Sequence, residues 1–550
     1  MNRFLWLGML LLMLSWLVPN HYFPWVAFYS DYMAFLSLFA LFCAALYSGQ
    51  FPVSWLSLTG LVVACIPLIQ FLVGKIYFAG DALIAFAYIV ALALAVLIGK
   101  GLSSYSKEQV YLAITWTFLL GATISALMAV GQWLRVTETV WIMDLPIKGR
   151  PYANFAQPNN LATLLSLGLA ALAYLYEFRK FTAISAAFVA VVLLFCMALT
   201  ESRTPWMGVL VFVGWWGVKA RGAEFQLKVF HVILLAAVYA LFVLLLPEIA
   251  EILHLYALGV AKHAQALHRL DLWWQMILAV MQGGPWGYGW NQVSVAQIGV
   301  SLVYPVALVV EHSHNIVLDI LIWNGPVIGV AIVAFFACWF SWLAIKAKSK
   351  ESVFGVLAVG LILLHGMLEL PLEYAYFLIP AGVLLGMLEA DMGLPNAFAL
   401  PRWLGGLVLV FGVVSLGWVW QEYGIAEEDH RLMRFESSRI GNLRAEQAAP
   451  DIVLLTQLRE FLRFARTEAA PGMDEGQLEQ MRKIAHRYPY PPCLFRYALA
   501  LALNNHPDQA RIELMRLKSL HGEELYREAL NGIDALVEKY PQLASMDRDE

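Results

Sequence analysis

The sequence predicts an all-α, polytopic membrane protein with about 13 transmembrane helices. Of its 550 residues, 61% are hydrophobic and only 14% are charged, a balance that soluble globular domains do not reach. Apolar runs of about 17 to 22 residues recur from Leu5 to Trp420, and each is long enough to cross a bilayer. The backbone of such runs must satisfy its own hydrogen bonds, which favours helices.

The expected helices follow these apolar runs. The first run lacks a small-residue cleavage site, so we interpret it as a retained helix rather than a signal peptide. The run at 316–345 is long for one helix, so it could begin outside the hydrocarbon or be broken near "NGP", Asn324 to Pro326. The expected helices span residues 4–19, 33–48, 54–73, 82–99, 111–132, 160–176, 183–199, 206–218, 229–247, 316–345, 354–369, 374–390 and 403–420.

Lys and Arg predict the orientation, because they accumulate in short cytoplasmic loops. With the N-terminus inside, they concentrate in the inner loops, and an odd number of crossings leaves the tail outside. The predicted domains are an N-terminal transmembrane bundle with an outer loop, a large outer loop, C-terminal transmembrane helices, and an outer helical domain. Their bounds are 1–247 (with the outer loop at 133–158), 248–315, 316–420 and 421–550.

The tail has the composition of a soluble domain built from amphipathic helices. "DIVLLTQLREFLRFA" and "QLEQMRKIAHRY" carry apolar residues at helical spacing. "CLFRYALALALNNHPDQARIELMRLKSL" predicts a helical hairpin that turns at residues 504–507. Alanines on both arms, Ala498 and Ala510, suggest a tetratricopeptide-like pair. An ordinary helical domain is an equal alternative, because one pair does not make a repeat array.

Residues 309–325, "VVEHSHNIVLDILIWNG", begin as a polar cluster and continue as a membrane helix. A metal site is disfavoured, because helical residues two apart, such as His312 and His314, point about 200° from each other. Zinc also requires about three or four ligands, and no third ligand is evident near the two histidines. A histidine that only caps the helix at the headgroups is one alternative. The more specific hypothesis is that His314 acts as a general base, because histidine titrates near neutral pH. Asn315 would then orient a substrate group.

Two arginines are candidates for binding a phosphate or pyrophosphate. Arg203, in "LTESRTPW", stands at the outer end of an apolar run. Arg269 lies in the amphipathic stretch "ALHRLDLWWQMIL", where Trp273 and Trp274 suit a helix at the membrane interface. A turn rich in glycine and aromatics, "GGPWGYGWN", follows. The guanidinium fork can bind two phosphate oxygens, whereas the alternative is an arginine that extends to the lipid headgroups.

Two further polar stretches adjoin predicted helices. In "GRPYANFAQPNNLATLL", Asn159 or Asn160 could cap the following helix. Capping leaves Asn154 and Gln157 without a role, and carboxamides pair well with sugar hydroxyls. Arg150 opens the same stretch.

The stretch "LLHGMLELPLEYAYFLIP" places His365 and Glu369 four residues apart, on one face of a predicted helix. Ionisable groups at membrane depth are functional candidates. They could support the site, together with Glu373, or His365 and Glu369 could pair with each other.

Missing motifs narrow the chemistry. The chain has no P-loop, no Rossmann glycine pattern and no Ser-x-x-Lys, and its five cysteines show no CxxC or Cys/His zinc spacing. We therefore expect no cofactor, no metal and no nucleic acid. Because an outer compartment lacks nucleotide fuel, bond formation there needs an activated donor that arrives within the membrane. A lipid-linked sugar pyrophosphate fits, since it brings its own leaving group.

At these residues the sequence resembles the PglL-type bacterial protein O-oligosaccharyltransferases, the pilin glycosylation ligases of the O-antigen ligase and polymerase superfamily. "GRPYANFAQPNNLA" resembles their N-terminal signature, and "SRTPW" their Ser-Arg helix start. "RLDLWWQMI" with "GPWGYGWN" resembles the Arg, Trp and Pro-x-Gly-x-Gly stretch of their large loop. His314 and Asn315, followed by nine residues and Gly325, match a His-Asn-x9-Gly motif. "HGMLELPLEYAYFLIPAG" resembles their helix pair, although a serine is expected after His365.

The resemblance implies a multi-pass protein of the bacterial inner membrane with its site facing the periplasm. It implies an undecaprenyl-pyrophosphate-linked oligosaccharide as donor and a Ser or Thr hydroxyl of a pilin or other periplasmic protein as acceptor. His314 maps to the catalytic histidine, and Arg203 and Arg269 map to the donor-binding arginines. The expected glycan or acceptor contacts are Arg150, Asn154, Gln157, Glu311 and Asn315.

Three alternatives stay open at this stage. An O-antigen ligase or an O-antigen polymerase would share the same build, although an outer helical tail suits docking of an acceptor protein. A flippase or transporter of lipid-linked glycan belongs to another class. Transporters usually show internal repeats and broken midplane helices, whereas here the polar groups gather at one face.

Overall fold

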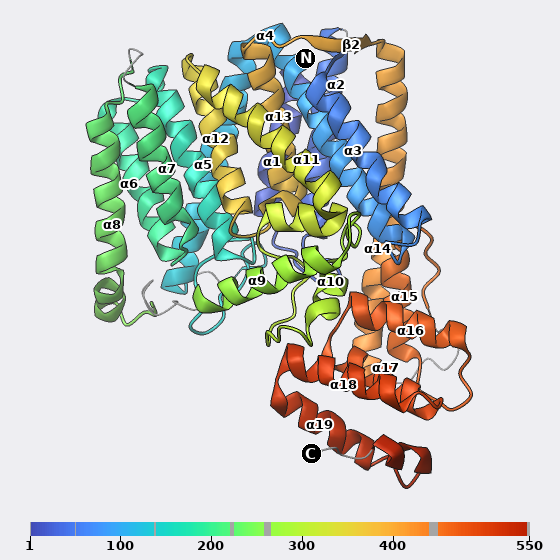
Figure 1. The fold of residues 1–550 in the computed structure, drawn as a ribbon. Coiled ribbons are helices and arrows are strands. Elements are labelled where there is room, and N and C mark those ends of the chain that lie inside the picture. Colours follow the sequence, from blue (N-terminus) through green and yellow to red (C-terminus); the bar gives the residue numbers. More distant parts are fainter. Residues whose placement is uncertain are drawn as a thin grey trace. The chain divides into compact units, whose positions relative to one another are not determined.

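A computed structural model describes residues 2–49, 51–136, 139–220, 225–257, 266–438 and 449–546. This part of the chain is mostly helical, as Figure 1 shows. Its α-helices are α1 (Asn2–Leu17), α2 (Phe28–Ser48), α3 (Trp55–Leu72), α4 (Ala79–Leu134), α5 (Pro158–Glu177), α6 (Ala183–Leu199), α7 (Thr204–Lys219), α8 (Val229–Ile252), α9 (Ala266–Gln282), α10 (Val293–Val300), α11 (Ile316–Lys346), α12 (Lys350–Gly366), α13 (Ala375–Asp391), α14 (Arg402–Ser437), α15 (Thr456–Arg466), α16 (Glu475–Arg487), α17 (Pro491–Leu503), α18 (Pro507–His521) and α19 (Glu523–Asp534). The 3₁₀ helices are η2 (Pro371–Glu373) and η3 (Pro541–Met546).

Among the described residues, seven helices have the length and apolar composition to cross a membrane: α2, α3, α4, α5, α8, α11 and α14. The predicted mostly helical fold is confirmed, and the apolar helices agree with a polytopic membrane protein. The count of about 13 spans stays a prediction. Helix α4 contains both predicted helices 82–99 and 111–132, and between them Ser106 leaves helical geometry (φ −153°, ψ 76°).

Two features differ from the sequence-based expectation. Helix α14 runs without interruption to Ser437, past residue 421, where the change of composition begins the predicted tail. A pair of strands, β1 (Phe51–Ser54) and β2 (Asn396–Leu400), was not expected; the strands are antiparallel, with Phe51 opposite Leu400. Both strands join apolar helices, and pairing satisfies the backbone of these extended connections.

The chain forms two compact units, and neither is a continuous stretch of sequence. Unit 1 comprises Met1–Ala64, Ala87–Ala264 and Ala337–Gly417, and unit 2 comprises Cys65–Phe86, Gln265–Phe336 and Trp418–Glu550. Helices α3, α4, α11 and α14 contribute residues to both units. The four consecutive domains expected from the sequence stay a prediction about membrane topology.

In unit 1, helices α5, α6, α7 and α8 lie side by side, and α12 packs on α5, α7 and α13 (Figure 1). Helices α4 and α13 approach until their backbones touch. A Cβ atom on Gly386 would lie 1.9 Å from the Val96 carbonyl oxygen, and one on Gly99 would lie 2.0 Å from that of Val383. Small residues allow such contacts between membrane helices, where lipid supplies no hydrophobic drive for association.

In unit 2, the tail contains the predicted helical hairpin. Helices α17 and α18 pack together across the turn at Asn504 and Asn505, and Ala498 and Ala510 are fully buried. Helix α19 packs on α18, so the arrangement continues beyond one pair (Figure 1). A tetratricopeptide-like repeat stays a prediction.

We predict that Gly386→Ala destabilises unit 1, because its Cβ atom would overlap the backbone of α4. Overpacking of this kind costs about 1–3 kcal/mol or more. Gly360→Ala in α12 is the matched control, since a Cβ atom there meets nothing within 4 Å and both changes gain the same helix propensity. Thermal unfolding in detergent should show a lower Tm for Gly386→Ala alone; equal Tm values would contradict the packing argument.

Candidate active site

The residues singled out from the sequence divide between the two units. Unit 2 holds Arg269, Glu311, His314 and Asn315. Unit 1 holds Arg150, Asn154, Gln157, Arg203, His365, Glu369 and Glu373.

His314 lies two residues before the first residue of α11, and Asn315, between them, caps that helix. The Asn315 Oδ1 atom accepts hydrogen bonds from the backbone N–H groups of Val317 (3.0 Å) and Leu318 (3.3 Å). The first N–H groups of a helix have no partner within it, so this cap satisfies two of them. Capping therefore belongs to Asn315, which disfavours the alternative that His314 caps the helix. A contact of Asn315 with substrate stays a prediction.

The residue before His314 is fixed as firmly as the residue after it. Ser313 is fully buried, and its N–H donates to Asp319 Oδ1 at 2.8 Å. Its hydroxyl donates to the Asn315 carbonyl at 2.9 Å, and its own carbonyl accepts the indole N–H of Trp273 at 3.1 Å. The flanking residues are thus locked, while His314 itself is partly exposed.

His314 has a left-handed backbone conformation, with φ of 56°. Residues other than glycine seldom adopt this conformation, although histidine does so more often than most. Strained backbone persists only where the surrounding structure holds it, and such residues gather at functional sites. This geometry supports a functional role for His314.

Helix α11 breaks at Gly325 (φ 70°, ψ 173°), which confirms the interruption expected at "NGP". The glycine-rich turn after α9 fits against this break. Tyr288 and Gly289 donate their backbone N–H groups to the carbonyls of Ile322 (2.9 Å) and Trp323 (3.0 Å). A Cβ atom on Gly325 would lie 2.3 Å from the Pro285 carbonyl oxygen. The nine residues between Asn315 and Gly325 therefore form one helical segment, which begins after the Asn315 cap and ends at the break.

Two residues that the sequence analysis did not single out complete this frame. The Trp290 ring stacks on Trp323 with centroids 4.5 Å apart, and its indole N–H donates to Asn324 Oδ1 at 3.0 Å. The side chain of Gln70 accepts a hydrogen bond from the backbone N–H of Trp290 (3.1 Å) and donates one to the Trp323 carbonyl (2.8 Å). The sequence feature that could have identified Gln70 is its position as a polar carboxamide within an otherwise apolar run.

The amphipathic stretch around Arg269 is helix α9. Leu272, Met276 and Ala279 are buried on one face, whereas Trp274 is half exposed. Arg269 lies in the first turn and is partly exposed. The indole N–H of Trp273 donates to the Ser313 carbonyl, and the position of α9 at the membrane interface stays a prediction.

In unit 1, Asn159 connects two of the predicted stretches. Its Nδ2 donates to Glu369 Oε1 at 3.0 Å, and its Oδ1 accepts from the Ser202 hydroxyl at 2.5 Å. Arg203, the next residue, is exposed at the start of α7. The bonds of Asn159 thus join buried Glu369 to the Ser-Arg pair.

The predicted cap of α5 is wrong. Gln157 occupies the N-cap position and makes no side-chain capping bond. Asn160 donates to the Tyr376 hydroxyl at 3.0 Å, while Asn159 bonds Glu369 and Ser202. The carboxamides are drawn into tertiary bonds because buried polar groups need partners, and Pro158 at the helix start leaves one fewer N–H to cap.

The predicted shared helix face of His365 and Glu369 is also wrong. Helix α12 ends at Gly366, so Glu369 lies beyond it. Pro371 disfavours helical geometry in the residue before it, which favours an early end. His365 is fully buried with Nδ1 2.8 Å from the Thr163 hydroxyl, and Glu373 is partly buried in η2. A supporting role for these three residues stays a prediction.

Asn154 makes several hydrogen bonds within and beside the loop that was predicted to be an outer one. It is buried, its Nδ2 donates to the carbonyls of Leu17 (2.7 Å) and Trp141 (2.8 Å), and its Oδ1 accepts from the Met143 N–H at 3.0 Å. These bonds use both donor hydrogens and favour a structural role over the predicted glycan contact.

Arg150 and Gln157 keep more access to solvent, since both are partly exposed. Arg150 donates to the Glu201 carbonyl at 3.4 Å. Burial lowers the pKa of Arg150, which nevertheless keeps its charge because a guanidinium titrates far above neutral pH. Arg150 therefore stays available as a cation beside the start of α7.

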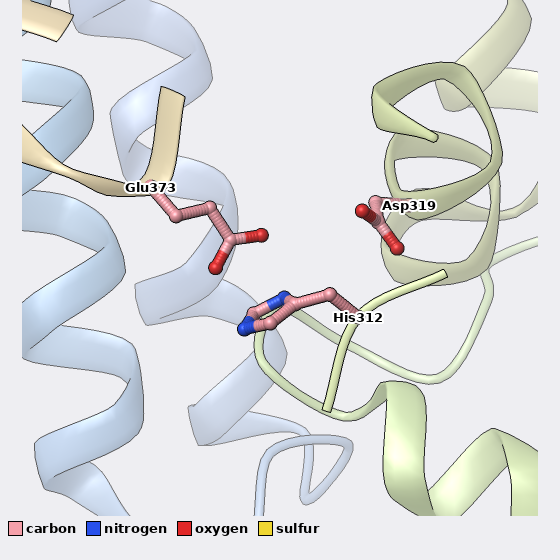
Figure 2. A group of neighbouring side chains, drawn as sticks. All are labelled: His312, Asp319 and Glu373. Carbon is pink, nitrogen blue, oxygen red and sulfur yellow. The ribbon is translucent and has the colours of Figure 1, made fainter. Parts of the chain in front are cut away.

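A ring nitrogen of His312 and a carboxylate oxygen of Asp319, both residues of unit 2, lie within 4.8 Å of each other; Figure 2 shows the two side chains. Figure 2 also labels Glu373, which belongs to unit 1. Asp319 already accepts the Ser313 N–H. Within unit 2 the pair supplies two of the roughly three or four ligands that zinc requires. The expectation of a metal-independent site stays a prediction.

We predict that Gly325→Ala destabilises the contact between α11 and the turn after α9 more than Gly284→Ala does. Both glycines have a positive φ (70° and 71°), so alanine is strained at either position; with a ψ of 173°, Gly325 lies in a region almost confined to glycine. Only at Gly325 does the Cβ atom also overlap backbone atoms, whereas Gly284 faces open space. Thermal unfolding of the purified variants should separate the two; an equal fall in Tm would refute the close contact.

Three family models match the chain: "Protein glycosylation ligase" over residues 151–176, "O-Antigen ligase" over 188–334, and "Virulence factor membrane-bound polymerase, C-terminal" over 353–531. No solved structure matches. The chain is 32% identical to a general O-oligosaccharyltransferase of Acinetobacter baylyi over 540 residues, 96% of this chain and 94% of that protein. It is 27% identical to a ComP-specific O-oligosaccharyltransferase of the same organism, over 80% of each chain. The chain therefore belongs to the O-oligosaccharyltransferases and is a membrane-bound glycosyltransferase.

Proposed function

We propose that the protein transfers an oligosaccharide from an undecaprenyl-pyrophosphate carrier to Ser or Thr hydroxyls of periplasmic proteins, pilins among them. Family membership supports the reaction class. The observation that carries the site is the geometry of His314, a partly exposed histidine with a strained backbone between two locked neighbours. That arrangement restrains the backbone at His314 without burying the side chain.

In the proposed reaction, His314 takes the proton from the acceptor hydroxyl. The hydroxyl oxygen attacks the anomeric carbon of the lipid-linked sugar, and the bond from that carbon to the pyrophosphate oxygen breaks. The electron pair of the broken bond leaves with the pyrophosphate lipid, and a single displacement inverts the anomeric centre. A positioned general base of this kind typically contributes about 10²- to 10⁴-fold.

Arg203 and Arg269 are proposed to bind pyrophosphate oxygens and to stabilise the negative charge that grows on the leaving group. Each lies at the N-terminal end of a helix, α7 and α9 respectively. The partial positive charge of a helix N-terminus adds to that of the guanidinium, which favours an anion there. Arg150 and Gln157 are proposed as further contacts to glycan or acceptor.

The proposed location is the bacterial inner membrane, with the active site and the tail in the periplasm. The distribution of Lys and Arg over the loops supports this orientation. A lipid-linked donor reaches the site from the membrane, whereas a protein acceptor reaches it from water. The polar residues before α11 are proposed to lie where these two phases meet.

An O-antigen ligase or polymerase is the second candidate, because two of the matching family models carry those descriptions. The relatives matched over most of the chain are instead O-oligosaccharyltransferases, one of them named as ComP-specific, and residues 151–176 match the model of a "Protein glycosylation ligase". This favours protein as the acceptor. A transporter is set aside, because the chain belongs to a glycosyltransferase family.

We predict that His314→Ala lowers transfer by about 10²- to 10⁴-fold, the usual contribution of a general base. His312→Ala, two positions away, is the matched control and should keep most of the activity. The measurement is transfer of a defined lipid-linked oligosaccharide to a purified acceptor in detergent, with and without a chelator. Near-normal rates in His314→Ala, or an inactive His312→Ala, would disprove the assignment; loss of activity with chelator would point to a metal.

Lysine in place of either arginine should impair transfer, because lysine keeps the charge but loses the two-pronged grip on pyrophosphate. Arg203→Lys and Arg269→Lys are expected to insert and fold normally while losing at least about tenfold in kcat, as expected when a charged transition-state contact is weakened. Arg179→Lys, on a predicted inner loop, serves as the matched control. Normal kinetics in both variants would rule out bidentate binding.

A further inference from the structure

In unit 2, the tail contacts the segment that carries His314. The Tyr490 hydroxyl, between α16 and α17, donates a hydrogen bond to Glu311 Oε1 at 3.0 Å. A terminal nitrogen of Arg487 lies 3.8 Å from the other carboxylate oxygen of Glu311. Glu311 stands three residues before His314 in the sequence. Both oxygens of this carboxylate therefore face groups of the tail.

The arginine that faces Glu311 is itself held rigidly. Arg487 is only 7% exposed, and its Nε and one terminal nitrogen donate to the carboxylate of Asp81 at 3.2 and 3.1 Å. The Ser294 hydroxyl donates to the Arg487 carbonyl at 2.8 Å. A two-pronged pair of this kind is geometrically specific, so Arg487 presents a fixed cation to Glu311.

The hydrophobic core of the tail is completed by residues from outside the tail. Two residues from outside the tail are buried within the core that α16, α17, α18 and α19 form. They are Phe78, from the first segment of unit 2 (Cys65–Phe86), and Ile298, from α10. Val309, two residues before Glu311, is partly buried against the same core. Burial of apolar surface ties these segments together, so the tail and the segment leading to His314 share one core.

The other side of this segment is anchored without the tail. The Val310 N–H donates to Gln297 Oε1 at 3.1 Å, and Ser313 bonds Asp319 and Trp273. Between these two anchors Glu311 projects outward with a side chain 43% exposed. The tail is what restrains Glu311 there.

We propose that Tyr490 and Arg487 are positioning residues that act through Glu311 on the conformation of His314. The tail then supports the catalytic segment, in addition to any role in docking acceptors. This inference rests on the proposed function insofar as His314 is the base. It assigns Glu311 a structural bond in place of the contact with glycan or acceptor that was expected from the sequence.

Tyr490→Phe tests the inference, because it removes one exposed hydroxyl and leaves the ring and the buried ion pair intact. We expect kcat to fall about tenfold with an unchanged KM for the acceptor, since small misplacements of a catalytic group are costly. Hydrogen exchange in residues 309–315 should become faster. Tyr540→Phe, another tail tyrosine whose ring packs on the tail core, is the matched control and should change neither measurement.

A double-mutant cycle with Glu311→Ala shows through which residue Tyr490 acts. If it acts through Glu311, Tyr490→Phe should cause no further loss of kcat in the Glu311→Ala background. Additive losses, or a raised acceptor KM with normal kcat, would overturn the inference, the second by pointing to acceptor docking. Failure of the two proposals is distinguishable: an active His314→Ala defeats the base assignment, whereas normal exchange and kcat in Tyr490→Phe alongside an inactive His314→Ala defeat only the positioning role.

Discussion

The contact between Gly325 and the turn that contains Pro285 and Gly287 leaves no room for a side chain on either glycine. This constraint divides α11 and sets the length of its first segment, which begins at the Asn315 cap. His314 is the last residue before that segment. Its position thus depends on a helix secured at its far end by backbone bonds and at its near end by Ser313, Asn315 and Asp319.

Such a frame suits a general base that works where membrane and water meet. A lipid-linked donor arrives within the bilayer. A base that sampled many conformations would seldom be positioned for both the donor and the acceptor. Locked neighbours reduce the entropy lost when the reaction geometry is reached. The side chain nevertheless keeps access to solvent, which an acceptor from the aqueous phase requires. Rigid backbone with an accessible imidazole is the combination observed at His314.

The tail is more than an appended domain, because it packs against other segments of unit 2. Its core includes Phe78 and Ile298, and its polar groups reach Glu311. A soluble helical domain attached only through α14 would need none of these contacts. Shared burial therefore links the packing of the tail to that of the segment before His314 within unit 2.

The sequence by itself determined the helical, membrane-spanning class, most helix positions, the break at Gly325 and the α17–α18 hairpin. These features follow from local properties: apolar length, helical periodicity and the conformational freedom of glycine. The family motifs also identified His314, Arg203 and Arg269 as candidates. Only the tertiary structure decided the partners of buried polar groups. It gave the cap of α11 to Asn315, drew Asn159 to Glu369 instead of a cap, ended α12 before Glu369, and joined Tyr490 to Glu311. The physical reason is that a buried polar atom bonds whichever group the packing brings within reach, however distant in the chain, and sequence spacing carries no record of that distance.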